Sequence, residues 1–281
     1  MKPQFLHEAT SSFVLWFDNY LLTKGEAYAN RTGSFTYSSD DILGSSYVSY
    51  SSPYKQWVGD SSISGAAIAN SVFVDGAEKN RGTDGLKIDY RNGRAVFDST
   101  VSASSSVTGS FSVKDFNIYI TDQDEEDLIT ESKFDINTRF STSEVPIAPY
   151  KQVVPAAFIS CQESKNTPHA FGGEDRTSLD FRCVFISDDM YKLDGALSIF
   201  NDTNDIVFNQ IGYDDFPETE FGDNKYGSYN YSDLSSLSTD KFFIQDVTTS
   251  KLSDKVSKKV LPNLFVGFVD FDVVKYRFPR Q

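Results

Sequence analysis

Cysteine and histidine are scarce in this chain of 281 residues, which has two of each. Cys161 and Cys183 each lie in an apolar run, AAFISC and FRCVFI. We therefore expect two buried, reduced thiols, with a disulfide between adjacent strands as the alternative. The cysteines and histidines are far apart and have no metal-ligand spacing, which argues against a zinc site.

Long apolar runs are also missing from the sequence. A membrane-spanning helix needs roughly 18 or more predominantly apolar residues in a row, and no segment meets that need. The N-terminal stretch carries Lys2 and Glu8 and lacks a small-residue cleavage site, so we do not expect a secretory signal there.

Motifs that mark known catalytic sites are absent as well. There is no G-x-S-x-G, and His7-Glu8 is not followed by the second histidine of a zinc protease. The loop 76–85 lacks the glycine spacing of a nucleotide-binding loop, and the acidic run 122–127 lacks the glycine of a calcium-binding loop. We expect that run to open a short helix instead, because carboxylates favour a helix N-terminus.

Side chains for general acid–base catalysis do not stand out either. A Ser/His/Asp triad would have to use His7 or His169, and the setting of His169 favours a surface role. Forty acidic residues leave many carboxylate pairs that could cleave glycosides, so their number decides nothing. We therefore predict no catalytic, cofactor-binding or metal-binding residues, no cofactor and no enzymatic activity.

Basic residues are outnumbered by acidic ones, 26 to 40, which gives a formal net charge of -14 and a pI near 4.5. A surface of this sign repels nucleic acid and anionic membranes. Basic and aromatic residues alternate only near the C-terminus, from Lys275 to Arg280, where we expect a frayed, solvated end.

Aromatic residues, by contrast, are plentiful: 24 Phe and 15 Tyr. In residues 3–24 they form an amphipathic helical pattern, which Gly25 is placed to terminate as the residue after the helix. We expect this stripe to pack on the chain's own sheet; a helix laid on a neighbouring subunit is the alternative. The stripe consists of Leu6, Ala9, Phe13, Trp16, Phe17, Tyr20 and Leu21.

The segment Gly85–Asp98 is the clearest predicted hairpin. Asn92-Gly93 lies between two strand-forming runs, and this dipeptide suits a two-residue type I′ turn. Such a turn would place Tyr90 opposite Ala95 and bury one face of the hairpin.

Further strands alternate with turns along the rest of the chain. We place a domain boundary near the prolines of residues 141–150, which divides the chain into 1–145 and 146–281. A helix is predicted from about 188 to 200, with Asp188 and Asp189 as candidate caps. The predicted strands cover 34–37, 46–50, 54–58, 71–74, 106–113, 116–120, 153–160, 179–187, 242–250 and 263–278.

Several phrases of the sequence resemble virion structural proteins of tailed bacteriophages. In the first half they are FLHEATSSFVLWFDNYLLTKGEAYAN, RGTDGLKIDYRNGRAVFD and VTGSFSVKDFNIYIT, and LFVGFVDFDVVKYRFP closes the chain. In the second half the succession VVPAAFIS, HAFGG, LDFRCVFIS and LDGALSIF is similar to the layout of tail-completion and head–tail connector proteins. The resemblance is one of pattern and phrase and covers most of the chain.

Pattern and resemblance together predict a β-rich α+β fold. An N-terminal helix and an antiparallel sandwich or barrel-like half would precede an α+β half with a mainly antiparallel sheet. The resemblance implies a non-enzymatic neck or tail protein of the virion, assembled in the bacterial cytoplasm as a cyclic homo-oligomer. Its partners would be itself and other neck or tail proteins, with no membrane and no sequence-specific binding of the DNA that passes through its lumen.

The alternative is a carbohydrate-binding or glycan-degrading tail protein. Sugar platforms use exposed aromatic side chains, and Trp57 is the candidate for one, although a strand tryptophan in a core is the favoured interpretation. A plain β-sandwich adhesion module is a third, weaker possibility.

Overall fold

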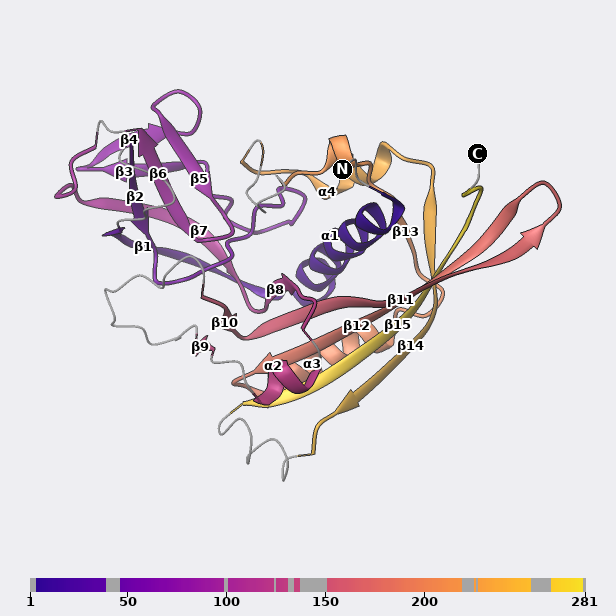
Figure 1. The fold of residues 1–281 in the computed structure, drawn as a ribbon. Coiled ribbons are helices and arrows are strands. Elements are labelled where there is room, and N and C mark those ends of the chain that lie inside the picture. The colour runs from indigo at the N-terminus through magenta and orange to yellow at the C-terminus, as the bar shows by residue number, and fades with distance from the viewer. Residues whose placement is uncertain are drawn as a thin grey trace.

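The computed structural model describes residues 4–38, 46–98, 101–123, 125–130, 134–136, 151–218, 225, 227–253 and 264–279. Within these residues the chain forms an N-terminal helix, three further helices and mostly antiparallel sheets (Figure 1). One sheet is nearly closed into a barrel and the other is a curled half-barrel, with 47% of the residues in strands. The predicted β-rich α+β class is thus confirmed.

Helix α1 (Phe5–Gly25) begins with a capping box, in which the Gln4 and His7 side chains bond to each other's backbone N–H. Glu8 in the first turn and Lys24 in the last suit the helix dipole. The predicted cap is off by one residue. Gly25 is still helical, and Glu26 adopts the left-handed conformation with φ 46°.

The first sheet contains seven strands in the order β4-β3-β7-β1-β2-β6-β5. Its edge strands meet where Arg81 bridges Leu86, which nearly closes the barrel. Trp57 and Phe111 stack in its core with ring centres 4.3 Å apart. The strands are β1 (Tyr28–Ser38), β2 (Tyr47–Ser51), β3 (Ser71–Val74), β4 (Ala77–Asn80), β5 (Leu86–Asp89), β6 (Arg94–Asp98) and β7 (Val107–Lys114).

The hairpin β5–β6 exists, but the predicted two-residue turn is wrong. Ile88 pairs with Ala95 and Asp89 with Arg94, so four residues, Tyr90 to Gly93, connect the strands. This register differs from the predicted one by two positions, which leaves the same side chains on the buried face. Gly93 has the expected positive φ of 64°, whereas Asn92 does not.

Asp89 explains the longer turn. Its carboxylate accepts hydrogen bonds from the Asn92 backbone N–H, the Asn92 side chain and the Arg94 guanidinium. An aspartate that bonds to the backbone ahead of it stabilises a turn of its own, and this competes with the Asn-Gly turn. The loop that contains Trp57 also contacts this turn, because the Trp57 backbone N–H donates to the Tyr90 carbonyl.

The second sheet contains six strands in the order β13-β14-β15-β12-β11-β8. All neighbours are antiparallel except β8, which runs parallel to β11. The strands are β8 (Asn117–Ile120), β11 (Ala156–Ala170), β12 (Glu174–Ser187), β13 (Val207–Asn209), β14 (Lys241–Lys251) and β15 (Phe265–Arg277).

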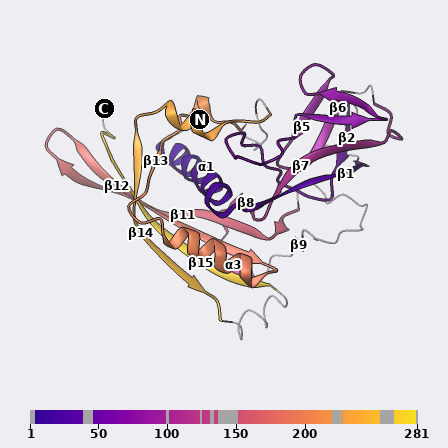
Figure 2. The same ribbon diagram turned by 180° about the vertical axis from the view of Figure 1, so that it is seen from behind.

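Helices α1 and α3 (Met190–Asn201) cover one face of the second sheet (Figure 2). Phe13 of α1 stacks on Phe181 of β12, and Phe17 of α1 stacks on Phe200 of α3, each with ring centres 4.1 Å apart. The aromatic stripe of α1 thus packs on the chain's own sheet, as predicted. The Asp189 carboxylate caps α3 by accepting from the Tyr191 N–H.

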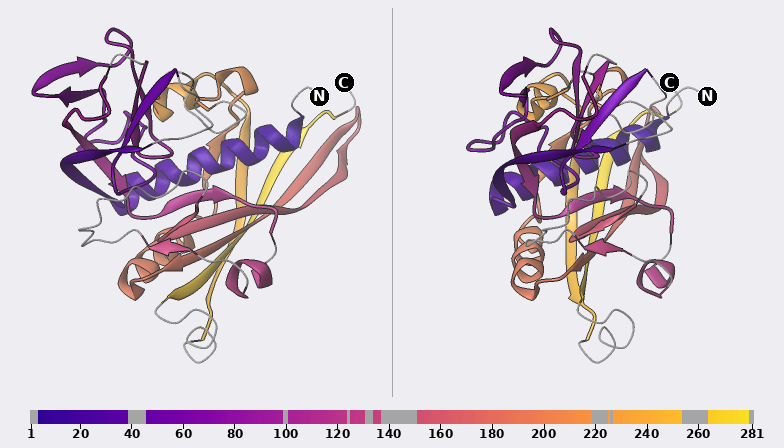
Figure 3. Two further views of the ribbon diagram at one scale, coloured as in Figure 1. Left: turned by 60° about the vertical axis from the view of Figure 1, so that its left-hand side comes forward. Right: turned by 90° about the vertical axis from the view of Figure 1, so that its left-hand side faces the viewer.

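On the opposite face of the second sheet, the described residues form a cover at one end. Helix α2 (Glu125–Thr130) places Leu128 and Ile129 there, over Phe158 and Phe268. The shorter elements are β9 (Asp135–Ile136), β10 (Val153–Val154), η1 (Tyr213–Asp215) and α4 (Tyr231–Ser236). Two further views show the N-terminal helix lying along the second sheet (Figure 3).

Two further expectations are wrong. Residues 54–58 are not a strand, because only Trp57 forms an isolated bridge, with Val113. Lys275 and Arg277 do not belong to a frayed end, and Arg280 lies outside the described residues. Lys275 is buried and bonds to Asp240, and Arg277 lies over the Phe5 ring at 3.8 Å.

The predicted division at residue 145 falls within 137–150, outside the described residues, and stays a prediction. In the described part, α1 and β8 share the second core with strands from the C-terminal half. None of the described helices is both long and apolar enough to cross a membrane.

Candidate functional site

The few candidate reactive side chains are not brought together. His7 Nδ1 accepts from the Gln4 N–H, and the His169 ring lies 4.5 Å from the Tyr276 ring. These are structural contacts, and neither involves a nucleophile. Among the described residues, no group of three or more His, Cys, Asp or Glu side chains is arranged to hold a metal ion.

Both cysteines are free thiols, as expected, but the expected burial holds for Cys183 and not for Cys161. Cys183 is buried and Cys161 is partly exposed on the neighbouring strand. Burial, reinforced by nearby Asp180, raises the pKa of Cys161 to about 11. The thiol therefore stays protonated at neutral pH, which makes it a poor nucleophile.

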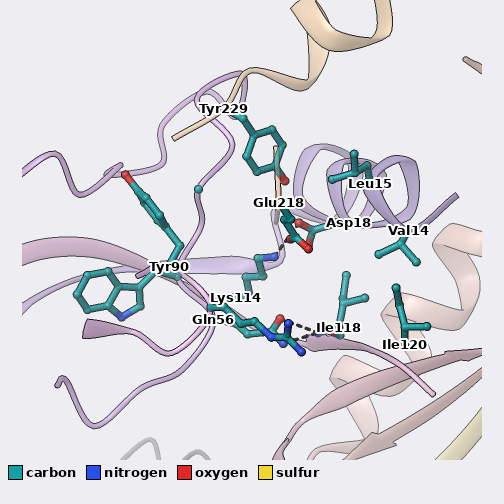
Figure 4. A pocket seen from close by; sticks show the side chains of 13 residues that line it. Val14, Leu15, Asp18, Gln56, Tyr90, Lys114, Ile118, Ile120, Glu218 and Tyr229 are labelled. Atoms are coloured by element: carbon teal, nitrogen blue, oxygen red, sulfur yellow. Dashed lines mark hydrogen bonds and ion pairs between the residues drawn. The ribbon is translucent and has the colours of Figure 1, made fainter. Parts of the chain in front are cut away.

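A buried ion pair links the two sheets. The carboxylate of Asp18, on α1, lies 2.7 Å from Nζ of Lys114, at the end of β7 (Figure 4). The hydroxyl of Tyr229 points toward the same carboxylate. Helix, first sheet and the segment before α4 thus meet at one carboxylate, which we call the junction.

A second buried carboxylate, Asp60, lies near Asp18, and we include it in the junction. It accepts from the Asn19 side chain at 2.8 Å, from the N–H and hydroxyl of Ser62, and from the Tyr231 N–H at 3.0 Å. Its oxygens therefore hold α1 and the start of α4 in place. Both acids act on backbone segments far apart in the chain, which is a structural role.

Burial dominates the acid–base properties of the junction. It raises the pKa of Asp18, and the adjacent Lys114 cation offsets part of that effect. Burial together with Asp18 and Asp60 raises the pKa of Tyr229 well above its ordinary value. An aspartate paired with a lysine is already satisfied, so Asp18 is a weak candidate for a general base.

The cavity beside the junction is small, about 130 Å³. Pockets for drug-sized ligands usually measure roughly 300–1,000 Å³. Charged side chains line one side of the cavity, and the other side is apolar (Figure 4). The apolar side consists of Val14, Leu15, Ile118 and Ile120.

The β11–β12 hairpin is the most prominent feature of the second sheet. Its tip projects beyond the neighbouring strand β15, which pairs with β12 as far as Asp175 (Figure 1). We call the outer part of the hairpin, residues 163–175, the arm. Every residue from Glu163 to Ala170 is exposed, and the side chain of Phe171 at the tip is fully exposed. In the part of the chain that is described, nothing but β12 pairs with this stretch of β11.

Sequence reasoning missed the arm, because the predicted strands 153–160 and 179–187 stop short of it. Periodicity detects burial of one face, and the arm portion of β11 buries neither face. The Gly172-Gly173 turn, which was predicted, is the signal that marks the tip.

Three aspartates lie side by side on the open part of the sheet. Asp272 of β15 pairs with Asp180 of β12 on one side and with Asp246 of β14 on the other. Desolvation and these two neighbours raise the pKa of Asp272, and its Oδ1 atom is buried without a hydrogen-bond partner. Each of the three looks like an ordinary exposed aspartate in the sequence, and only the strand register brings them together.

Trp57 is 1% exposed, in the core of the first sheet. Its indole N–H donates to Ser52, and its ring stacks on Phe111. The predicted core position is confirmed, and Trp57 offers no platform to a sugar.

Comparison with known proteins adds no family to these observations. No family model matches the chain, and a search of curated proteins finds no significant match.

Proposed function

We propose that this chain is a non-enzymatic structural subunit of a tailed-phage particle, in the neck or tail, which assembles as a cyclic homo-oligomer. It would contact neighbouring virion proteins as well as copies of itself. The observation that carries the proposal is the arm. The placement on a phage particle comes from the resemblance of sequence phrases alone.

The arm has the properties of a segment that a neighbour covers. Its inner strand, β12, pairs with β15, but the outer edge of β11 has no partner among the described residues, and such an edge can pair with another chain. Residues 163–170 expose both faces, and the tip presents an aromatic side chain, Phe171, to solvent. A large exposed aromatic on a projecting element is typical of an interface anchor.

The charge of the chain fits a particle through which DNA passes. With a formal net charge of -14, the protein has no excess of cations to bind phosphates. Repulsion would keep a DNA path free of strong contacts, and we expect any DNA-facing surface to be acidic or neutral.

The alternative of a sugar-binding or glycan-degrading tail protein has less support. Both tryptophans, Trp16 and Trp57, are buried. Exposed tyrosines such as Tyr191 remain as candidate sugar contacts. Glycan-array binding or release of reducing sugars by the purified protein would favour this alternative over the structural role.

The test is to measure the mass and symmetry of the purified protein by native mass spectrometry and electron microscopy, and its place in a particle reconstruction. We expect rings of several copies. A variant that lacks residues 168–175, with Thr167 joined to Arg176 by Asn-Gly, should fold but fail to enter particles. The joint preserves the Thr167–Arg176 pair and suits a two-residue turn.

A matched control removes an exposed aromatic elsewhere. Tyr191→Ser on α3 should assemble normally, whereas Phe171→Ser should assemble poorly. Isolated monomers on the capsid surface of a reconstruction, or glycan cleavage by the wild-type protein, would contradict the proposal.

A further inference from the structure

Both edges of the second sheet are largely open. Strand β8 covers β11 only along Ala156–Ile159, and β13 covers β14 only along Lys241–Phe243. The Ile244 backbone also bonds to Asp205 and Ile206. Beyond these stretches, no described residue pairs with the outer edge of β11 up to residue 170, or with that of β14 from residue 245 to 251. Unpaired strand edges present rows of free N–H and C=O groups that can pair with another chain.

The hydrogen-bond pattern shows which groups point outward. On β14, Leu252 N–H donates inward to the Val266 carbonyl. Because the direction alternates along an antiparallel strand, Val247, Thr249 and Lys251 point their backbone groups outward. The stretch between the bulge at Gln245 and Lys251 contains three β-branched residues and no proline, which favours strand pairing.

The corresponding stretch of β11 is bounded by its irregularities. Register shifts occur between Cys161 and Glu163 and between Pro168 and Ala170. Pro168 has no N–H and so fits only a position that does not donate to β12. By alternation from Pro168, Ser164 and Asn166 also point their backbone groups outward. The regular outer edge of β11 therefore spans residues 163–167.

The strand directions favour a head-to-tail contact. From β11 through β12 and β15 to β14, each strand runs antiparallel to the one before, so β14 runs opposite to β11. A second copy in the same orientation would therefore present its β11 antiparallel to β14. A two-fold pairing of identical edges would leave the other edge of each copy open, whereas a head-to-tail pairing uses both.

We propose that the outer edge of β14, around Thr249, pairs with the outer edge of β11, around Ser164, in the next copy. The second sheet would then continue from subunit to subunit. This inference rests on the proposed homo-oligomer and names its contact. The two edges are open at opposite ends of the sheet, so the strands would tilt relative to the ring axis, as they do in closed barrels.

Proline substitution at outward-pointing positions tests the contact. Thr249→Pro and Ser164→Pro each remove one outward N–H, and proline is tolerated at such positions of edge strands. We expect both variants to remain folded and to lose the oligomer. Thr249→Ala and Ser164→Ala, which keep the N–H, are the matched controls and should assemble. Thr249→Ala also controls for the side-chain bond to Asn201.

Mixing the two proline variants distinguishes head-to-tail from two-fold pairing. Thr249→Pro keeps an intact β11 edge, and Ser164→Pro keeps an intact β14 edge. Their mixture should therefore form dimers, while each variant alone stays monomeric. Self-association of either variant alone would overturn the head-to-tail contact.

Cysteine cross-linking keeps the proposal testable if a proline variant misfolds. In a Cys161→Ser background, Ser164→Cys combined with Thr249→Cys should form intermolecular disulfides, and neither single variant should. A wild-type oligomer that the proline variants leave intact would refute edge pairing but not the proposed function. A wild-type monomer, both in solution and in the particle, would refute the homo-oligomer itself.

Discussion

The edge strands of the two sheets are arranged differently. In the first sheet the edge strands β4 and β5 meet at the Arg81–Leu86 bridge, and the barrel nearly closes. In the second sheet β8 and β13 are short, and most of the outer edge of β11 and of β14 has no partner among the described residues. A closed sheet needs no partner for its edges, and an open one invites pairing. The difference suggests that the first sheet is self-sufficient and the second is built to be extended.

The two cores also differ, because the first lies within its own sheet and the second needs helices. Trp57 and Phe111 lie inside the first sheet itself. The second core depends on helices laid on one face, with Phe13 and Phe17 of α1 among the rings of β12 and α3. The second sheet thus requires the N-terminus of the chain for its own completion. The junction at Asp18 then ties this helix to the first sheet.

The largest expected effect tests whether the junction couples the sheets. Lys114→Met leaves the Asp18 carboxylate buried without its cation. Breaking a buried pair in this way costs about 3–5 kcal/mol of unfolding free energy. Urea unfolding followed by tryptophan fluorescence measures this, because Trp16 lies in the second core and Trp57 in the first. Trp→Phe variants isolate each signal, and we expect both midpoints to fall together.

The control for this prediction is Asp18→Asn combined with Lys114→Met. It removes the unpaired charge and should recover most of the loss. Burial already raises the pKa of Asp18 in the folded state. Such a group stabilises the fold below its unfolded pKa and loses that contribution as pH rises through the folded pKa. The deficit of the single variant should therefore shrink toward about pH 4, and a deficit that grows there would contradict this account.

Much of the fold could be predicted from the sequence, because burial leaves a periodic pattern. Helix α1, helix α3 and the buried parts of β12 and β15 were all found in this way. The arm was missed because it buries no face, and the hairpin turn was mispredicted because Asp89 reaches forward to Asn92 and Arg94.

The junction and the aspartate row could not be predicted, since they depend on which distant segments meet. Lys114 lies 96 residues from Asp18, and only the fold brings the two together. Asp18 did carry one signal, because it interrupts an apolar stretch of the helix, VLWFDNYLL. A charged residue at a position that faces a core requires a partner.

An intermediate effect is expected at the turn of the first sheet. Gly93 has φ 64°, and a Cβ there would lie 1.9 Å from the Tyr54 carbonyl oxygen. Left-handed backbone costs a residue with a side chain about 1–2 kcal/mol, and crowding adds about 1–3 kcal/mol. We therefore expect Gly93→Ala to lower the unfolding free energy by about 2–5 kcal/mol in urea titrations.

Gly76, in the turn between β3 and β4, provides the matched control. Its φ is 84°, but a Cβ added at this position would have no atom within 4 Å. Gly76→Ala should therefore show the backbone cost alone, about 1–2 kcal/mol. Equal losses in the two variants would show that the close approach of the loop at Tyr54 adds nothing to the turn.

The smallest effect concerns the open face of the second sheet, where like charges oppose each other. Desolvation, Asp180 and Asp246 raise the pKa of Asp272 in the folded state. Its ionised form is therefore disfavoured by folding, and stability associated with this group falls as pH rises through its folded pKa. Asp272→Asn should raise the unfolding free energy at pH 7 by about 0.2–1 kcal/mol, the usual scale for cross-strand pairs. An amide could also donate a hydrogen bond to a neighbouring carboxylate.

This gain should vanish near pH 3, where the aspartates are protonated in both states. Asp122→Asn, at an exposed site with no such neighbours across a strand, controls for the change in net charge and should have little effect. A loss of stability in Asp272→Asn at pH 7 would show that the folded protein uses the negative charge of the row. The first sheet offers a contrast, because Asp89 is matched there by Arg94 at 2.7 Å. In the second sheet, Arg176 offsets the raised pKa of Asp272 only in part. This is what we expect if the second sheet meets its partners only in the assembly.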